Sequence, residues 1–290
     1  MSLARAILKE MRPKQWVKNV LVFAAPGAAG VLDNGPYAWR ALVIFVAFCL
    51  ASSGTYFWND ILDVEADRNH PRKSKRPIAS GAIPLGLARV IGTLLVLAGI
   101  GLSFVPRWQA GLVVIGYVVL TTSYSLVLKH LAVVDLVTVA SGFILRAIGG
   151  AVATQVDMSR WFLLTTSFAS LFIVTGKRYG ELRDLGDSGE TRATLEEYSY
   201  GFLRIVLSVS CGAALVTYCI WAFDTKEIAG TSGPYYELSI VPMATALLRY
   251  TLILEQGHGA APEEIFAHDR TLQVLGLIWV IVFGLGVYVS

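Results

Sequence analysis

The chain has 290 residues, of which 55% are hydrophobic and 16% are charged, and its mean hydropathy is +0.59. A soluble domain is usually about 25% charged, so this chain has too few charged side chains to cover a folded body in water. The excess apolar surface must face lipid, which excludes a soluble protein. The net charge of +3 is modest, and we expect no nucleic-acid partner, because basic residues on a membrane protein more often set topology or contact lipid phosphates.

Nine segments are apolar and long enough to cross a bilayer as helices. A crossing takes about 20 residues, and every backbone polar group within it must be satisfied inside the helix. The predicted spans leave no room for a separate soluble domain, so we expect an all-α, polytopic membrane protein that forms one domain over residues 1–290. The spans lie near 17–33, 40–58, 86–105, 108–125, 131–153, 160–176, 202–222, 236–254 and 272–289.

The distribution of Lys and Arg between the two sides of the membrane predicts the orientation. With the N-terminus inside, most cations fall before the first span and in the joins 59–85 and 177–201. The other side then carries only Arg40, Arg107, Arg160 and Lys226. Because basic loops stay in the cytoplasm, we expect a multi-pass protein of the plasma membrane with its N-terminus inside.

The cytoplasmic end of the second predicted span carries closely spaced carboxylates. Asp60, Asp63 and Asp67 stand at i, i+3 and i+7, and Asn59 precedes them. On a helix this spacing puts the three carboxylates on one face, where they repel one another. Divalent cations would neutralise them, and Mg²⁺ is the usual ion where carboxylates share a metal with substrate phosphates.

A basic run follows the carboxylates and includes Lys73 and Arg76. Metal ions bridge the oxygens of a diphosphate, while Lys and Arg neutralise its remaining charge. Acidic residues followed by basic ones therefore indicate a diphosphate site on the cytoplasmic side. A solvated helix end before a basic, topology-setting loop is the simpler alternative.

Two further places carry charge near or within the predicted spans. Arg146 lies deep in the fifth span, where a charge is costly unless it is paired or hydrated, and Asp135 nearer the start of that span is a candidate partner. The loop that begins at Lys177 places Glu181 and Asp184 three residues apart. That loop is predicted on the same side as the aspartates, although a salt-bridged helix would explain its spacing nearly as well.

The motif of Asn59, Asp60, Asp63 and Asp67 in a nine-span protein resembles the UbiA superfamily of intramembrane prenyltransferases. In that superfamily two acidic motifs bind Mg²⁺ and an isoprenoid diphosphate. The resemblance covers nearly the whole chain and implies a UbiA-like helical bundle. The chain departs from the common pattern at the second motif, where Lys177, Arg178 and Glu181 replace the usual pair of aspartates.

In this departure the chain resembles one branch of the superfamily, the decaprenyl-phosphate phosphoribosyltransferases. Three other features resemble the same branch: the N-terminal run from Arg12 to Asn19, Tyr124 with Lys129, and Arg146 between Leu145 and Ala147. The branch implies a Mg²⁺-dependent transferase that moves 5-phosphoribose from phosphoribosyl diphosphate to a polyprenyl phosphate. Its product feeds the synthesis of cell-wall arabinan. Members of the superfamily are known as monomers and as oligomers, which leaves a homo-oligomer open.

The resemblance also implies roles for individual residues. The catalytic set is Asp60, Asp63 and Asp67. The metal ligands are Asn59, Asp60, Asp63 and Asp67, with Glu181 or Asp184 completing the coordination. The cations expected at the donor phosphates are Lys73, Arg76, Lys177 and Arg178. The remaining substrate-binding candidates, with Asn59 again, are Lys14, Lys18, Tyr124, Lys129 and Arg146, of which Lys14, Lys18 and Arg146 suit the acceptor phosphate or the 5-phosphate of the donor.

Two other functions remain alternatives. A conventional UbiA-type enzyme would use a prenyl diphosphate as its donor, which the cationic second motif argues against. A transporter would use Asp135 and Arg146 as a charge pair within the membrane, but such proteins usually contain an internal repeat, and none is evident in this sequence.

Overall fold

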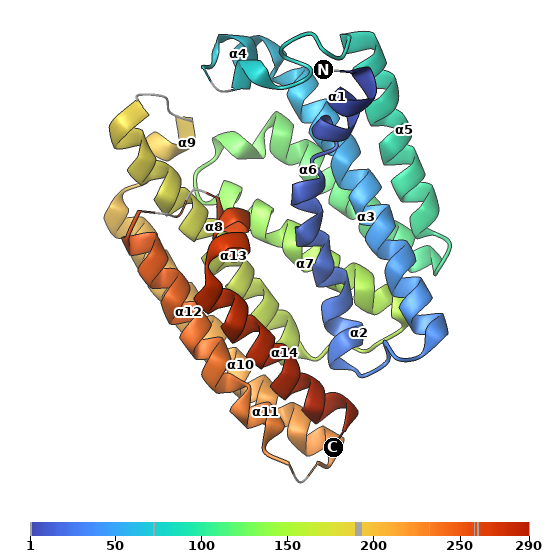
Figure 1. Cartoon of the computed structure of the whole chain (residues 1–290), viewed down its shortest axis with the longest axis vertical. Coiled ribbons are helices and arrows are strands. Elements are labelled where there is room, and N and C mark those ends of the chain that lie inside the picture. Colours follow the sequence, from blue (N-terminus) through green and yellow to red (C-terminus); the bar gives the residue numbers. More distant parts are fainter. Residues whose placement is uncertain are drawn as a thin grey trace. The chain divides into compact units, whose positions relative to one another are not determined.

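The computed structural model describes residues 2–71, 73–188, 193–231, 233–257, 259 and 261–289, and every regular element in this part of the chain is a helix (Figure 1). The chain folds into two compact units. Unit 1 comprises residues 1–27, 31–127 and 145–157, and unit 2 comprises residues 28–30, 128–144 and 158–290. The helix α7 (Val134–Thr154) contributes its first half to unit 2 and its second half to unit 1.

Unit 1 begins with a short amphipathic helix and a 3₁₀ helix, and then contains three long helices with short pieces between them. Besides the second half of α7, its elements are α1 (Leu3–Glu10), η1 (Pro13–Phe23), α2 (Ala24–Ala28), α3 (Gly35–Leu62), α4 (Val64–Asn69), η2 (Lys73–Lys75), α5 (Leu85–Ser103) and α6 (Trp108–Leu126).

Unit 2 contains four long helices and several short ones. Besides the first half of α7, its elements are η3 (Leu128–His130), α8 (Arg160–Ser188), α9 (Ala193–Glu196), α10 (Tyr200–Ala229), α11 (Tyr235–Leu238), α12 (Ile240–Glu255), α13 (Pro262–His268) and α14 (Arg270–Tyr288).

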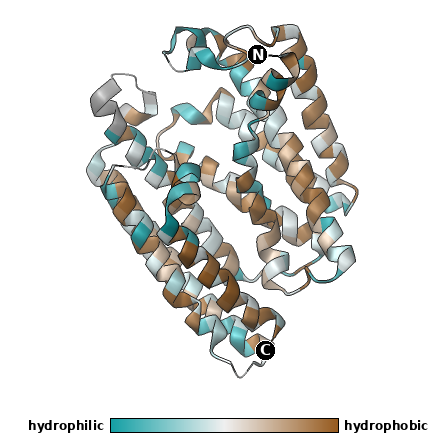
Figure 2. Ribbon diagram, in the orientation of Figure 1, coloured by the Kyte–Doolittle hydropathy of each residue, from teal (hydrophilic) through white to brown (hydrophobic). Residues whose placement is uncertain are grey.

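Seven helical segments in the described part of the chain are long and apolar enough to cross a membrane, and they coincide with seven of the nine predicted spans. The ribbons of α5 and α14 are apolar over most of their length, whereas α4 is largely polar (Figure 2). The protein is therefore a multi-pass membrane protein, as predicted. The prediction of nine spans is not confirmed, because two of the predicted segments differ from an ordinary spanning helix.

The segment predicted at 17–33 is not one continuous α-helix. An 11-residue 3₁₀ helix, η1, runs into the five-residue α2. Pro26 has no N–H to donate to the Val22 carbonyl, as an α-helix would require. A 3₁₀ helix rises about 2.0 Å per residue against about 1.5 Å in an α-helix, so these few residues still extend about 30 Å, the thickness of the hydrocarbon core.

The segment predicted at 160–176 lies within α8, which is helical as expected. This helix continues to Ser188 and carries Lys177, Arg178 and several acidic residues in its second half. It is therefore more polar than the seven segments that are apolar enough to cross a membrane.

Small residues bring α3 and α5 into close contact in unit 1 (Figure 1). A Cβ atom added at Gly99 would lie 2.7 Å from the Ala51 backbone nitrogen, and one added at Gly54 would lie 2.7 Å from the Gly92 carbonyl oxygen. Without a hydrophobic driving force between helices in lipid, such close backbone packing supplies the attraction.

Aromatic side chains join the helices of unit 2. The Tyr218 hydroxyl in α10 accepts a hydrogen bond from the Trp279 indole of α14 at 2.6 Å, and it is bonded to the Ser239 hydroxyl at 2.6 Å. Phe172 of α8 meets Tyr250 of α12 edge to face, with ring centroids 5.4 Å apart. The polar tips of Tyr218 and Trp279 thus have partners, as apolar surroundings require.

We expect Gly99→Ala to destabilise unit 1 by about 1–3 kcal/mol, because the new methyl group must push α3 away from α5. Thermal unfolding in detergent measures the effect. Gly101→Ala in the same helix is the control, since a Cβ atom there meets nothing within 4 Å. Equal melting temperatures for the two variants would contradict the close approach of the helices.

Candidate functional site

The predicted carboxylates lie where α3 ends and α4 begins. Asp60 is in the last turn of α3 and is 1% exposed, and Asp67 is buried in α4. The Arg76 guanidinium contacts both carboxylates, at 3.1 Å from Asp60 and 2.6 Å from Asp67. The spacing predicts one continuous helical face, but α3 ends at Leu62, so Asp60 and Asp67 lie on two successive helices. Both acids are nevertheless within reach of one cation.

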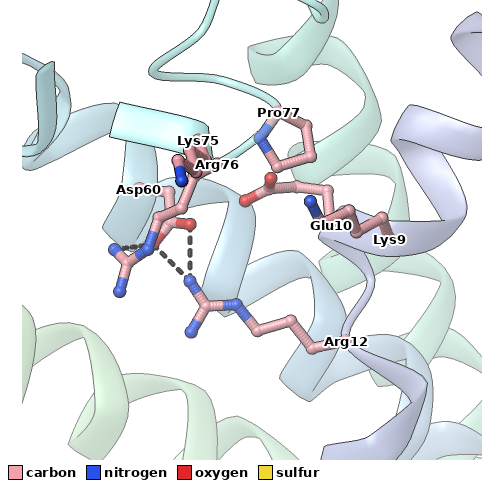
Figure 3. Close-up of a pocket in the computed structure, with 7 residues that line it drawn as sticks. All are labelled: Lys9, Glu10, Arg12, Asp60, Lys75, Arg76 and Pro77. Carbon is pink, nitrogen blue, oxygen red and sulfur yellow. Dashed lines mark hydrogen bonds and ion pairs between the residues drawn. The ribbon is translucent and has the colours of Figure 1, made fainter. Parts of the chain in front are cut away.

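A second guanidinium reaches Asp60 from the N-terminal segment. Arg12 Nη2 lies 2.5 Å from one Asp60 oxygen and 2.6 Å from the other (Figure 3). Arg12 adopts a left-handed backbone conformation with a φ of 53° at the start of η1, just before Pro13. The Met11 carbonyl next to it accepts a hydrogen bond from the Ser53 hydroxyl of α3 at 2.8 Å. The sharp turn and this bond together direct Arg12 towards Asp60.

The two arginines border a cavity of about 310 Å³ in unit 1, lined by Lys9, Glu10, Arg12, Asp60, Lys75, Arg76 and Pro77. Figure 3 shows the Glu10 carboxyl group pointing into this space. Glu10 is 1% exposed, and its Oε1 atom has no hydrogen-bond partner among the described residues. Burial first, and then the hydrogen bond and negative charge of Asp60, raise the pKa of Glu10 to about 8.

Sequence reasoning missed Glu10 and the contact of Arg12 with Asp60. Neither residue belongs to the spacing pattern of the aspartates, and Arg12 lies 48 residues before Asp60. The one signal in the sequence was that Glu10 is the sole acidic residue in the basic N-terminal stretch.

The other predicted residues of unit 1 lie at the end of α3 and in η1, η2 and α6. The Asn59 amide donates to Asp60 at 3.4 Å, and Asp63 caps α3 and is half-buried. Lys73 is half-buried in η2, and its backbone N–H donates to the His70 ring at 3.3 Å. The remaining candidates of this unit are exposed Lys14 and half-buried Lys18 in η1 and half-buried Tyr124 in α6.

Arg146 is enclosed by protein groups of unit 1. Its Nε donates to the Asn19 Oδ1 atom at 2.6 Å, and its Nη2 donates to the Tyr117 hydroxyl at 3.0 Å. Arg146 is 6% exposed and does not line the cavity beside Asp60. Its expected contact with a substrate phosphate stays a prediction.

Unit 2 contains a second buried network, centred on Asp135. The Asp135 carboxylate accepts hydrogen bonds from Arg178 Nε at 3.0 Å and from the Tyr198 hydroxyl. Arg178 Nη1 also contacts Glu181 at 2.6 Å. Asp135 and Arg178 are both buried, so two opposite charges satisfy each other within apolar surroundings.

The Tyr198 hydroxyl also accepts a hydrogen bond from the backbone N–H of Val133 at 2.6 Å. Val133 has a φ of 68°, which is costly for a β-branched residue. Tyr198 therefore stabilises the strained turn that follows Lys129, whose carbonyl accepts a hydrogen bond from Thr194 at 3.3 Å. Burial and the hydrogen bond to Asp135 raise the pKa of Tyr198 above its ordinary value.

The other predicted residues of unit 2 lie in or near the second half of α8. Lys177 Nζ is 3.8 Å from Glu181, so the two residues form an ion pair one helical turn apart. Lys129 is half-buried in η3. The side chain of Asp184 lies outside the described part of the structure.

We expect Tyr198→Phe to lower the free energy of unfolding by about 1–3 kcal/mol, because it leaves buried polar partners unsatisfied. Tyr200→Phe is the matched control, since the Tyr200 hydroxyl donates to the Leu182 carbonyl from an exposed side chain. Thermal unfolding in detergent compares the two variants, and an equal effect would contradict the role of Tyr198 in the turn.

Glu10 predicts a pH dependence of stability in metal-free buffer. Its pKa rises from 4.5 to about 8 on folding, so the folded state binds the proton more tightly than the unfolded state does. The stability that this proton contributes is therefore fully present below pH 4.5 and is lost as pH rises through about 8. The melting temperature of Glu10→Gln minus that of the wild type should increase across this window. A constant difference would contradict the raised pKa.

Comparison with known proteins places these features in a family. The model of the UbiA prenyltransferase family matches residues 20–275. The decaprenyl-phosphate phosphoribosyltransferase of Corynebacterium glutamicum is 43% identical over 99% of this chain and 88% of its own length. The protein of that name from Mycolicibacterium smegmatis is 40% identical over 100% of this chain and 94% of its own length.

A solved structure shares the fold. The UbiA homolog from Archaeoglobus fulgidus, bound to GPP and Mg²⁺, aligns with a TM-score of 0.73 over 98% of this chain and 100% of that chain. At 15% identity this likeness shows the fold alone, and it confirms the predicted UbiA-like helical architecture. The resemblance expected from the aspartate motif is also confirmed: the chain belongs to the UbiA prenyltransferase family.

Proposed function

We propose that this protein transfers 5-phosphoribose from phosphoribosyl diphosphate to a polyprenyl phosphate, with decaprenyl phosphate as the acceptor, and releases diphosphate. The observation that carries the proposal is the 43% identity to a decaprenyl-phosphate phosphoribosyltransferase over 99% of the chain. The cluster around Asp60 supports it independently, because carboxylates and guanidinium groups converge there as a metal-bound diphosphate requires.

The donor atoms of the cluster fit Mg²⁺. Asp60, Asp67 and Glu10 supply carboxylate oxygens, and the Glu10 Oε1 atom is buried without a hydrogen-bond partner in the described part of the chain. Among the described residues, these carboxylates do not form a group of three that could hold a metal ion by itself. Mg²⁺ does not require one, since it usually takes one or two carboxylates and completes its shell with water and substrate phosphates. When bound, the ion would neutralise charge on the leaving diphosphate.

Positive side chains outnumber carboxylates around the cavity. Lys9, Arg12, Lys75 and Arg76 face Glu10 and Asp60 there. This balance suits a ligand with several negative charges, because the cations can neutralise the phosphate oxygens that a metal leaves uncovered. Guanidinium groups also bind phosphate through two parallel hydrogen bonds, which fixes the orientation of the ligand. We assign the diphosphate of the donor to this cavity.

The proposed chemistry forms one bond and breaks one. A phosphate oxygen of the acceptor attacks the anomeric carbon of the donor, and the bond from that carbon to the diphosphate oxygen breaks. The electron pair leaves with the diphosphate. Because a phosphate monoester is already largely ionised near pH 7, the chain need not provide a strong base. Its residues would act by holding the donor and stabilising the charge that develops on the leaving group.

We place the Asp60 cluster on the cytoplasmic face of the membrane. Lys and Arg are concentrated in the N-terminal residues and in the join that carries Lys73, Lys75 and Arg76, and basic loops favour the cytoplasm. A water-soluble donor would reach the site from that side, while the acceptor would arrive through the lipid. The roles of Lys177, Arg178, Glu181 and Asp184 in binding donor or metal stay predictions.

Transfer of label tests the function directly. Detergent-purified protein is incubated with phosphoribosyl diphosphate labelled in its ribose, Mg²⁺ and decaprenyl phosphate, and label extracted into organic solvent is counted. We expect lipid-bound label that disappears on addition of EDTA. If no label reached the lipid while the same preparation consumed geranyl diphosphate, the function would be that of a conventional prenyltransferase.

We expect Asp60→Asn to lower the rate of transfer by at least about 100-fold, because it removes the carboxylate that both arginines hold. Asp67→Asn should act in the same direction. Glu65→Gln is the matched control, since Glu65 is an exposed acidic residue of α4 and should keep the wild-type rate. Wild-type activity in Asp60→Asn would remove the diphosphate site from this position.

A further inference from the structure

Two residues of α7, one helical turn apart, hold the 3₁₀ helix η1. Arg146 Nε donates to the Asn19 Oδ1 atom at 2.6 Å, and both side chains are buried. One turn later, a Cβ atom added at Gly150 would lie 1.8 Å from the carbonyl oxygen of Val22. The two backbones are in direct contact at this point, so no residue with a side chain could replace Gly150.

The spacing of these contacts matches the two helix types. Residues 19 and 22 are one turn apart in a 3₁₀ helix, which rises about 6 Å over three residues. Residues 146 and 150 are about one turn apart in an α-helix, which rises about 6 Å over four residues. If η1 were an α-helix, its two contact points would be only about 4.5 Å apart along the axis. The paired contacts thus fix both the geometry and the register of η1.

The charge of Arg146 is stabilised within unit 1. Its guanidinium also donates to the Tyr117 hydroxyl at 3.0 Å and lies over the Tyr117 ring, 4.7 Å from the centroid. The Phe48 ring is 6.0 Å from the guanidinium carbon. An arginine within a membrane helix is costly unless its charge is compensated, and these contacts offset that cost. Through these contacts the Arg146 side chain binds to η1, α3 and α6.

The other end of η1 carries the residue that reaches the site. Ser53 of α3 binds the Met11 carbonyl at 2.8 Å and accepts a hydrogen bond from the Trp16 indole at 3.1 Å. Arg12, between them in sequence, contacts Asp60. Arg12 directly precedes Pro13, the first residue of η1, so a shift of η1 along its axis would displace Arg12 from Asp60.

We propose that Arg146 and Gly150 are positioning residues that set the register of η1 and thereby hold Arg12 against Asp60 for the transfer reaction. This role rests on the proposed function. It gives Arg146 a place in the reaction through Asn19 and η1, instead of the direct substrate contact that the sequence indicates.

A double-variant cycle separates positioning from direct binding. We expect Gly150→Ala and Arg146→Gln each to lower kcat/KM at least about tenfold, since small displacements at an active site have large effects on rate. In an Arg12→Ala background, neither change should lower kcat/KM by more than about twofold, because the residue through which they act is already gone. If Arg12→Ala alone is too slow to measure, Arg12→Lys replaces it.

The control is Gly116→Ala in α6, where a Cβ atom meets nothing within 4 Å, and it should match the wild type. Tyr117→Phe is a milder variant should Gly150→Ala fail to fold, and it should follow the same cycle with a smaller single effect. If the losses multiply in the double variants, these residues do not act through Arg12, and a direct substrate contact or a general folding defect takes the place of the proposal.

A second readout does not depend on activity. The native Cys49 of α3 is the reporter in protein whose Cys211 and Cys219 are replaced by serine, and its labelling by a small maleimide is followed. Cys49 is buried and accepts a hydrogen bond from the Asn19 amide of η1 at 3.2 Å, so Gly150→Ala should accelerate labelling and Gly116→Ala should not. If the wild type transfers no phosphoribose but labelling responds as expected, the register role stands and the proposed function fails. Equal labelling rates would overturn the register role.

Discussion

The buried carboxylate of Asp60 is held by two guanidinium groups, Arg12 from before η1 and Arg76 from the loop after α4. Removing one partner of a buried ion pair typically costs about 3–5 kcal/mol, mostly because the other charge is left uncompensated. The N-terminal segment, the end of α3 and the loop before α5 are therefore tied to one point. Arg76 extends the same constraint to Asp67 in α4.

The buried arginines Arg146 of unit 1 and Arg178 of unit 2 are stabilised in different ways. In unit 2, Asp135 and Arg178 neutralise each other, and Tyr198 completes the shell of the carboxylate. In unit 1, Arg146 is held by the amide oxygen of Asn19, the hydroxyl of Tyr117 and aromatic faces. An ion pair without net charge needs only a dry and well-packed site. A cation held by dipoles instead depends on the exact placement of the segment that supplies them, which is why Arg146 and the register of η1 belong together.

The sequence predicted those features that depend on local periodicity. Seven of the predicted spans coincide with long apolar helices. Asp60 and Asp67 lie close enough to share one cation, although on two helices instead of the one that their spacing predicts. The sequence could not predict contacts between residues far apart in the chain. Arg12 and Asp60 are 48 residues apart, and Arg146 and Asn19 are 127 apart. Hydropathy also could not reveal that residues 13–23 are a 3₁₀ helix, because its apolar composition is compatible with either helix type.

The buried arginines Arg146 and Arg178 show that the charge of a residue does not by itself identify a phosphate site. Arg146 was a candidate for phosphate because a cation within a span demands an explanation. Arg178 was a candidate because cations stand where the resembling family usually carries a second acidic motif. In the structure each is bound by protein groups, and Asp135, the candidate partner of Arg146 by sequence, is instead paired with Arg178. The cations that border the cavity, by contrast, come from ordinary-looking basic stretches near the ends of α1 and η2. Arg12 and Arg76 are also bound, to Asp60, but their side chains remain 27% and 29% exposed, against 4% for Arg178. A phosphate site needs cations that can still face a ligand, and these two arginines keep that access.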